Sequence, residues 1–346
     1  MAKQAKSNWS TYKDVIMDAK KGNASRIYLF TGEEKYLIDR TVSSLKKQWI
    51  SPGAESLDFY NKDMGQSELS ISDFQNFVGS PPFMSKFRLT VIHNAGLWGP
   101  KAPSDSKTVD AWKEVFAAVP EWACVLFVEE KVDKRKKQMI DAVSQNGMLV
   151  DVAMLDEDTL EAWIRSRLEP QKIKISKDCM ASLISRVDSS MRMIDNEITK
   201  LILYCQNTNT TTIDMKILEM LCLPDVHATV FNMTDAIGKK KPGQALELLE
   251  DLVRLKEPIP KIRLMLSRHI RHLICAKEIG SQEKLVEMLK LHPFAAKNLV
   301  AQSKNFTVEQ LERIYNLCFE SDQWVKTGKM DDRMSLEVLL AACGKV

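Results

Sequence analysis

The residues with the clearest chemical interest follow an apolar run near the N-terminus. The run RIYLF (26–30) leads into Thr31, Gly32, Glu33 and Glu34, and a helical pattern begins directly after them. A strand, a tight turn and a helix form the setting in which nucleotide-binding proteins hold phosphates, but that chemistry needs GxxxxGK[ST]. This turn has neither the upstream glycine nor the Lys-Ser/Thr pair, and it places two carboxylates where phosphates would lie. We therefore expect a degenerate turn that binds no nucleotide, with its carboxylates suited to a helix N-terminus.

A histidine pair, His269 and His272, has the i, i+3 spacing that can chelate a metal on a helix. Its neighbours are Arg268 and Arg271, and no HExxH motif or carboxylate ligand accompanies it. A solvated or DNA-facing helix surface is the favoured interpretation over a metal site. No GxSxG motif is present either, so we expect no catalytic residue, no metal and no cofactor.

The segment GSPPFMSK (79–86) is the first of two features that predict binding. Its prolines end a helical pattern, so Pro82, Phe83 and Met84 fall in a connection where periodicity does not require large apolar residues. A rigid loop that presents an aromatic ring and a methionine can anchor in a partner's hydrophobic pocket. The alternative, which the sequence leaves open, is that Phe83 packs under its own sheet.

The second feature is the basic segment from Lys256 to Lys277. It carries six lysines and arginines against the single acid Glu257. Such a helix surface can follow a phosphate backbone without reading bases, although charged surfaces are more often only solvated. The residues that would face DNA are Lys261, Arg263, Arg268 and Arg271. The run KVDKRKK (131–137) has the same two interpretations.

The elements that would position these residues change character along the chain. Up to about residue 152, apolar runs alternate with helical patterns, which predicts βαβ units and a parallel sheet. After Val152 we expect only helices: a small helical domain at 153–224 and a larger one at 225–346, divided at Leu223-Pro224-Asp225. The expected strands are RIYLF (26–30), SLDFY (56–60), FRLTVIH (87–93), ACVLFV (123–128) and GMLVDV (147–152). The fold class is thus α/β plus all-α, with domains at 1–152, 153–224 and 225–346.

Capping patterns place two of the later helices. Asp156 can cap a helix, with Leu155 and Leu160 as its hydrophobic staple, and Thr307 with Gln310 forms a capping-box pattern.

Composition excludes several classes of protein. The chain has 346 residues and a net charge of only +3, so bulk charge does not indicate a nucleic-acid binder. Its seven cysteines are scattered without a CxxC pair, which fits a reducing compartment and no disulfide framework. No apolar run approaches the roughly 18 residues of a membrane span. We expect a soluble, cytoplasmic protein without a membrane contact.

Taken in order, these segments resemble the delta subunit of bacterial DNA polymerase III, the clamp-loader subunit that opens the sliding clamp. The resemblance covers nearly the whole chain, and the order and spacing of its parts make it specific. It rests on IYLFTGEEKYLID, PPFMSKFRLTVIHNAG and VEEKVDKRKKQMIDAV near the N-terminus, on MIDNEITKLILY in the middle, and on FNMTDAIGKKKPGQALELLEDL and WVKTGKMDDRMSLEVLLAA near the C-terminus.

The resemblance implies an AAA+-like α/β domain, a helical lid and a C-terminal helical collar that joins a ring. It also implies a subunit that does not bind ATP itself, within a DNA-directed DNA polymerase holoenzyme, a nucleotidyltransferase. The implied partners are the beta sliding clamp, the ATPase (tau/gamma) and delta-prime subunits, and primer-template DNA through the complex. Such a subunit would be cytoplasmic and associated with the nucleoid through the replisome. The clamp contact maps onto Phe83 first, then Pro82 and Met84.

Three alternatives remain at this point. An AAA+-like ATPase with an unorthodox site would bind nucleotide, against which Glu33 and Glu34 argue. A delta-prime-like stator usually carries a Ser-Arg-Cys motif and often a cysteine cluster, and this chain has neither. A DNA-binding scaffold would use the basic segment and show strong salt-dependent DNA affinity.

Overall fold

A computed structural model of the chain describes residues 9–65, 67–99, 102–187, 190–222 and 226–345. The chain divides into two compact units, of which the first runs to Met154 and the second starts at Leu155. The predicted break at Leu223-Pro224-Asp225 lies outside the described residues. The further division of the second unit into lid and collar therefore stays a prediction.

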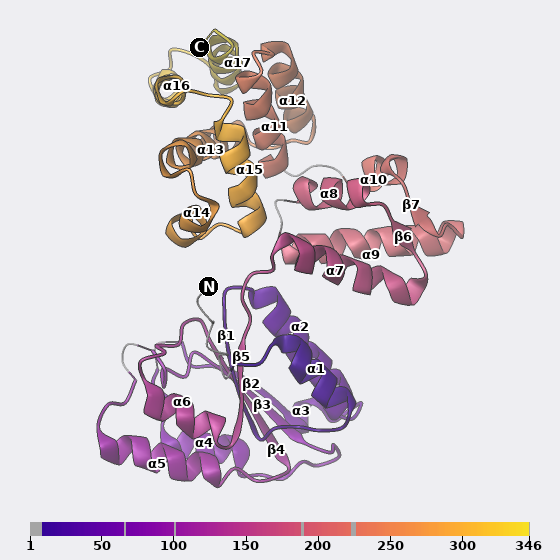
Figure 1. The fold of residues 1–346 in the computed structure, drawn as a ribbon, viewed down its shortest axis with the longest axis vertical. Coiled ribbons are helices and arrows are strands. Elements are labelled where there is room, and N and C mark those ends of the chain that lie inside the picture. The colour runs from indigo at the N-terminus through magenta and orange to yellow at the C-terminus, as the bar shows by residue number, and fades with distance from the viewer. Residues whose placement is uncertain (1–8, 66, 100–101, 188–189, 223–225, 346) are drawn as a thin grey trace, which may run out of the picture. The chain divides into compact units, whose positions relative to one another are not determined.

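The first unit is a parallel five-stranded sheet with helices between its strands (Figure 1). The strand order is β2-β3-β4-β1-β5, and every pairing is parallel, which confirms the predicted α/β class. Its elements are α1 (Tyr12–Lys20), β1 (Ile27–Thr31), α2 (Lys35–Trp49), α3 (Glu55–Asp58), β2 (Phe59–Asp63), α4 (Ile71–Val78), β3 (Arg88–His93), α5 (Ser106–Ala117), β4 (Ala123–Glu129), α6 (Lys137–Ser144) and β5 (Gly147–Asp151).

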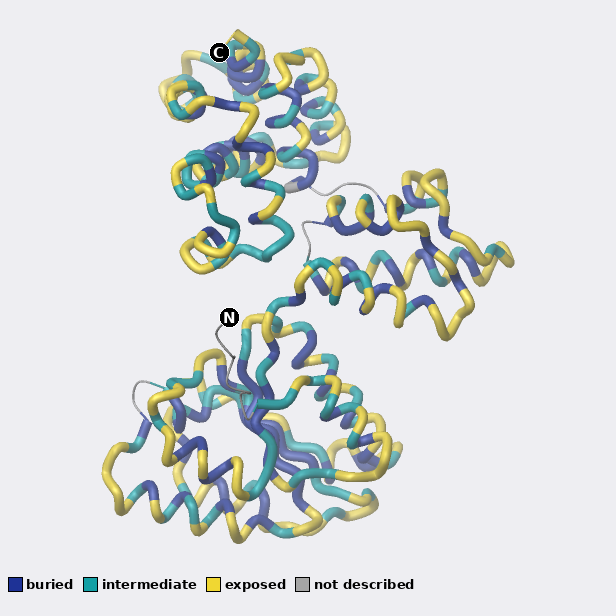
Figure 2. The backbone as a smooth tube through the Cα atoms, viewed as in Figure 1, coloured by how far each residue is buried: buried dark blue, intermediate teal, exposed yellow. Residues whose placement is uncertain are grey.

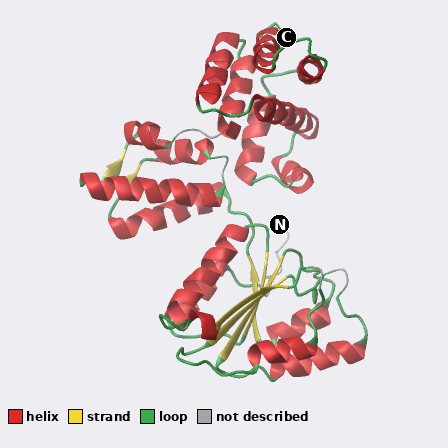
Figure 3. Cartoon of the chain, turned by 180° about the vertical axis from the view of Figure 1, so that it is seen from behind, coloured by secondary structure: helices red, strands yellow, loops and turns green. Residues whose placement is uncertain are grey.

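Helices cover both faces of this sheet, so its central strands are buried (Figures 2 and 3). Alternate residues of β1 point to opposite faces, as the period of two requires. Ile27 and Leu29 belong to an aromatic core with side chains from α4, α5 and β4. A parallel sheet buried on both faces needs apolar residues on both sides of its strands, which is why RIYLF reads as a continuous apolar run.

One predicted strand is placed differently. The sequence predicts a strand over SLDFY (56–60), but residues Glu55–Asp58 form the one-turn helix α3, and β2 begins only at Phe59. The reason lies in the pairing, because Phe59 aligns with Leu89 close to the start of β3 at Arg88. A strand at 56–58 would run past its neighbour with unpaired backbone.

The second unit is mainly helical. Its elements are α7 (Glu157–Leu168), the 3-10 helix η1 (Glu169–Gln171), β6 (Lys174–Ile175), α8 (Lys177–Arg186), α9 (Met191–Thr208), β7 (Thr212–Ile213), α10 (Met215–Leu221), α11 (Val226–Gly238), α12 (Pro242–Arg254), α13 (Ile259–Ile279), α14 (Gln282–Leu289), α15 (Pro293–Ser303), α16 (Val308–Lys326) and α17 (Asp332–Cys343). The expectation that strands end at Val152 is wrong, because β6 and β7 pair in parallel. Two-residue strands are too short for an alternating pattern.

Both predicted helix caps are confirmed. Asp156 accepts the Thr159 N–H at 2.8 Å, and Leu155 and Leu160 are buried beside it. Thr307 and Gln310 form a complete capping box at the start of α16. A hydrophobic cluster made from residues between Val226 and Cys343 forms the core of the helices after α10. Among the described residues, no helix is both long enough and apolar enough to cross a membrane.

Candidate partner-binding loop and degenerate turn

The turn after β1 is closed by the chain's own backbone. Gly32 has a φ of +135°, and a Cβ atom there would lie 2.2 Å from the Val152 carbonyl oxygen. The Val152 N–H donates to the Thr31 carbonyl at 2.8 Å, and the Glu34 N–H donates to the Val152 carbonyl at 3.2 Å. Glycine is therefore required here by close backbone packing, without any ligand.

The amides at the start of the following helix, α2, also form hydrogen bonds within the chain. Glu34 caps α2 by accepting the Tyr36 N–H at 3.3 Å, and Lys35 forms an ion pair with Glu130. Burial raises the pKa of the Glu34 carboxyl, while the hydrogen bond from Tyr36 opposes that rise. A helix N-terminus that binds phosphate offers free amides and positive charge. This one offers a carboxylate cap, which supports the prediction of a degenerate turn.

The connection between α4 and β3 has the opposite character. In the segment Ser80–Lys86, which we call the Phe83 loop, Phe83 is 74% exposed and Met84 is 61% exposed. Pro82 is half-buried. The alternative that Phe83 packs under its own sheet is thus not what the structure shows. Two adjacent large apolar side chains in solvent are unusual for a loop and indicate a contact surface.

The backbone of the Phe83 loop is held by two residues outside it. Asp58, the last residue of α3, is fully buried and accepts three consecutive backbone N–H groups, those of Phe83, Met84 at 2.9 Å and Ser85 at 2.8 Å. The Ser51 hydroxyl donates to the Met84 carbonyl at 3.1 Å, and the Ser51 N–H donates to the Ser85 hydroxyl at 2.9 Å. The loop is therefore an ordered turn with an apolar tip.

The electrostatics of Asp58 follow from these contacts. Burial opposes ionisation, but hydrogen bonds from the Phe83 and Met84 amides and from Ser85 outweigh burial and lower the pKa of Asp58 to about 2. The carboxylate is consequently charged at neutral pH. A charged acceptor makes shorter and stronger hydrogen bonds than a neutral one.

Most of the basic segment lies in α13, and the predicted DNA-facing residues differ in how far they are exposed. Lys261, Arg268 and Arg271 are exposed, and Lys261 pairs with Glu257 at 2.8 Å. Arg268 and Arg271 also act on His272, since burial and these two charges lower the pKa of that imidazole to about 4. The exposed cations keep the DNA-facing interpretation open as a proposal.

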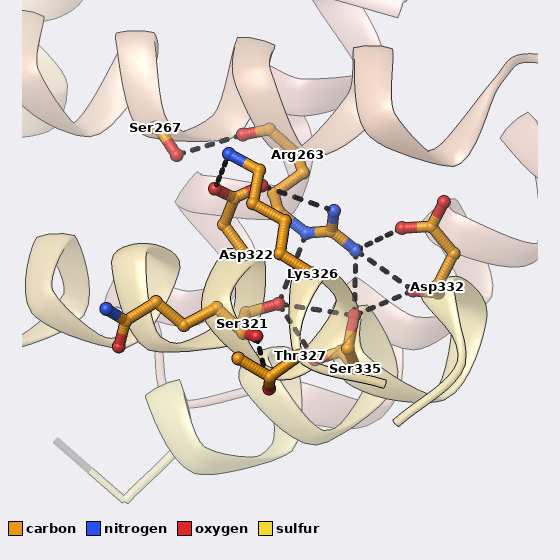
Figure 4. Close-up of polar contacts among 9 residues, drawn as sticks. Arg263, Ser267, Ser321, Asp322, Lys326, Thr327, Asp332 and Ser335 are labelled. Atoms are coloured by element: carbon orange, nitrogen blue, oxygen red, sulfur yellow. Dashed lines mark hydrogen bonds and ion pairs between the residues drawn. The ribbon is translucent and has the colours of Figure 1, made fainter. Parts of the chain in front are cut away.

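The expectation for Arg263 is wrong. Arg263 is 5% exposed, and its side chain points between α13, α16 and α17 (Figure 4). The guanidinium donates to the Ser335 hydroxyl at 2.7 Å and the Ser321 hydroxyl at 3.3 Å, and it pairs with Asp332 at 2.5 Å. A cation enclosed by its own partners stabilises the packing of three helices and is not available to a phosphate.

The first histidine of the pair, His269, has partners within the protein. His269 Nε2 lies 2.7 Å from Gln302 Oε1, and its ring packs edge-on against Phe231. No group of three or more metal-ligating side chains occurs among the described residues.

Comparison with known proteins decides the family. Two family models match the chain: the DNA polymerase III delta subunit at residues 28–153 and its C-terminal domain at residues 227–343. The chain belongs to the DNA polymerase III delta subunit family.

Relatives of this family align over much of the chain. DNA polymerase III subunit delta from Bacillus subtilis is 25% identical over 94% of this chain and 95% of its own length. A probable DNA polymerase III subunit delta from Aquifex aeolicus is 21% identical over 73% of this chain and 71% of its own length. The solved structure of a Bacillus subtilis DNA clamp loader delta protein has the same fold, with a TM-score of 0.79, 23% identity and coverage of 97% and 100%.

The sequence places Pro82, Phe83 and Met84 in a connection, leaves the exposure of Phe83 open and does not identify the residues that support the loop. Ser51 and Asp58 lie in a stretch that was predicted as strand and connection, and no motif marks them. The signal available was a lone aspartate within an apolar run, SLDFY, which a buried strand does not explain.

Proposed function

We propose that this chain is a clamp-loader subunit that binds and opens the beta sliding clamp through the Phe83 loop, without hydrolysing ATP itself. The observation that carries the proposal is the display of Phe83 and Met84 on a loop whose backbone is fixed by Asp58 and Ser51. Family membership supports the setting, since the similar Bacillus subtilis structure is described as a clamp loader delta protein.

The proposed mechanism is binding alone. Pro82, Phe83 and Met84 insert into a hydrophobic pocket of the clamp, and Phe83 is the main anchor, because aromatic side chains in central pockets dominate interface energetics. A subunit that binds the open clamp more tightly than the closed one shifts the clamp toward the open state. No nucleotide is consumed in this step.

The timing of this step belongs to partner subunits. The chain assembles with ATPase (tau/gamma) and delta-prime subunits in a ring, in the cytoplasm at the nucleoid. ATP binding by those partners decides when the Phe83 loop can reach the clamp. The closed backbone at Gly32 supports a subunit that keeps the frame of a nucleotide-binding domain without its ligand.

A secondary role in DNA contact rests on α13. The exposed Arg268 and Arg271 lie on the same side of the helix as Lys261, and cations at this spacing can follow a phosphate backbone. Replacing both arginines by glutamine should weaken DNA binding of the assembled complex and reduce its salt dependence by about two phosphate contacts. An unchanged salt slope would remove this role.

Clamp opening tests the main function. A fluorophore pair across one clamp interface should report separation when the nucleotide-free chain is added. The variant Met84→Ala should open less clamp at equal concentration, because it truncates half of the apolar tip. Met17→Ala is the matched control, since Met17 is 51% exposed on α1, outside the loop. No opening by a folded wild-type chain would reject the proposal.

A further inference from the structure

The support of the Phe83 loop comes from the neighbouring strand connection at the same edge of the sheet. Asp58 directly precedes β2 and the loop shortly precedes β3, and these strands pair in parallel with Phe59 opposite Leu89. Strand starts of a parallel sheet lie along one edge. The sheet therefore brings Asp58 beside the loop, although 25 residues separate Asp58 from Phe83.

The contacts at this edge satisfy the loop's backbone from both sides. Asp58 accepts N–H groups from three consecutive loop residues, the arrangement of a backbone nest that encloses an anion. Ser51 satisfies a backbone acceptor of the loop, because its hydroxyl donates to the Met84 carbonyl. Phe83 and Met84 consequently present only their side chains to a partner, because their backbone N–H groups are already bonded to Asp58. A partner must recognise the apolar tip and cannot add a strand at these amides.

We propose that Asp58, assisted by Ser51, is a positioning residue for clamp binding, which holds the Phe83 loop in its displayed conformation before the partner arrives. This inference rests on the proposed function. A loop that is ordered before binding avoids the entropy cost of ordering at the interface. Asp58 lies beneath the loop and is fully buried, so it acts on the clamp only through the loop.

The substitution Asp58→Asn tests this role with little change of shape. An asparagine has one acceptor oxygen in place of two, and its amide group would face a loop N–H that the carboxylate now accepts. We expect amide hydrogen exchange of Phe83, Met84 and Ser85 to rise about tenfold or more, the scale of a lost charged hydrogen bond. Clamp affinity should fall by about tenfold as well.

A double-mutant cycle separates positioning from general stability. In the Asp58→Asn background, Phe83→Ala should cost clearly less clamp affinity than in the wild type, because a disordered loop already presents Phe83 poorly. Asp105→Asn is the matched control, since Asp105 accepts the Thr108 N–H as a helix cap and asparagine caps equally well. It should leave both exchange and affinity within about twofold.

The outcomes distinguish this inference from the proposed function. If Asp58→Asn leaves loop exchange and clamp affinity unchanged, the positioning role is overturned, while loss of binding in Phe83→Ala would still support the function. If the wild-type chain does not bind the clamp, the function fails and the exchange experiment still decides whether Asp58 orders the loop. Should Asp58→Asn fail to fold, Ser51→Ala removes the hydroxyl donor to Met84 and must raise loop exchange and weaken binding by several-fold, or the role is rejected.

Discussion

Two loops of the first unit, the Gly32 turn and the Phe83 loop, differ in what they leave accessible to a partner. The Gly32 turn follows β1 and lies where parallel strands end, which is the edge at which open α/β sheets usually bind ligands. The Phe83 loop precedes β3 and lies at the opposite edge. The first loop is closed by the backbone of Val152, whereas the second presents its largest side chains to solvent.

The two loops differ in which groups remain accessible once their backbone hydrogen bonds are formed. At the Gly32 turn, the Val152 carbonyl accepts the Glu34 N–H and the Glu34 carboxylate accepts the Tyr36 N–H, so these two amides are not available to a ligand. At the Phe83 loop, Asp58 and Ser51 satisfy the backbone in a way that leaves the side chains outside. A turn closed by the chain's own backbone therefore coexists on the same sheet with an ordered loop that displays an apolar tip.

The largest expected effect tests the closed turn. Gly32→Ala should destabilise the first unit by about 3 kcal/mol or more, because φ is positive and the new Cβ would collide with the Val152 backbone. Gly65→Ala is the control, since Gly65 also has positive φ but open space around its Cβ position, and it should cost about 1 kcal/mol. Equal midpoints of denaturant unfolding for the two variants would contradict the tight packing at Gly32.

Of the carboxylates beside the two loops, Glu129 should titrate near neutral pH, whereas Asp58 should stay charged there. Glu129 pairs with Thr31 in the sheet register and accepts the Ala95 N–H at 2.8 Å. Burial raises the pKa of Glu129 to about 7, and the hydrogen bonds from Ala95 and Gly96 only partly oppose it. The stability contribution of Glu129 is thus complete below pH 4.5 and is lost as pH rises through 7.

Unfolding free energy should therefore fall by about 2 kcal/mol between pH 5 and pH 8 through Glu129 alone. Glu129→Gln should remove this part of the slope and keep an acceptor for Ala95. The Phe83 loop should not change over the same range, because the lowered pKa of Asp58 keeps that carboxylate charged. A parallel slope in wild type and Glu129→Gln would reject the assignment.

The smallest expected effect is the response to nucleotide. A nucleotide present at 100 times the Kd of its site would add about 2.7 kcal/mol to the free energy of unfolding and raise the thermal midpoint by several degrees. The isolated chain should show no such shift with millimolar MgATP, because Glu34 caps α2 and the chain's own backbone closes the turn. A clear rise of the midpoint would reopen the ATPase alternative.

The sequence was sufficient for four of the five strands, for both caps and for the position of the Phe83 loop, because each of these depends on neighbouring residues. Apolar runs and turn residues placed β1, β3, β4 and β5 within one or two residues of their observed bounds. The prolines before Phe83 likewise separated the tip from any periodic element. Local patterns therefore predicted where the loop is, whereas the exposure of Phe83 and Met84 is known only from the structure.

The remaining features depend on contacts between distant residues. Arg263 looked like its exposed neighbours on α13, yet its partners Ser321, Asp332 and Ser335 lie more than 50 residues away in the chain. The role of Asp58 depends on the pairing of β2 with β3, which a sequence pattern does not specify. The helix α3 has only one turn, which is too short to show a helical periodicity. The sequence pattern therefore could not distinguish it from the start of a strand.

The most direct test of the central claim is an equilibrium titration of the nucleotide-free chain with its cognate sliding clamp. Phe83→Ala should weaken binding by about 2 kcal/mol or more, about 30-fold, which is the scale of an interface hot spot. Phe319→Ala is the control, because Phe319 is a 61% exposed phenylalanine on α16 in the other unit, and it should bind as the wild type does. Equal affinities for the folded wild type and Phe83→Ala would contradict the account.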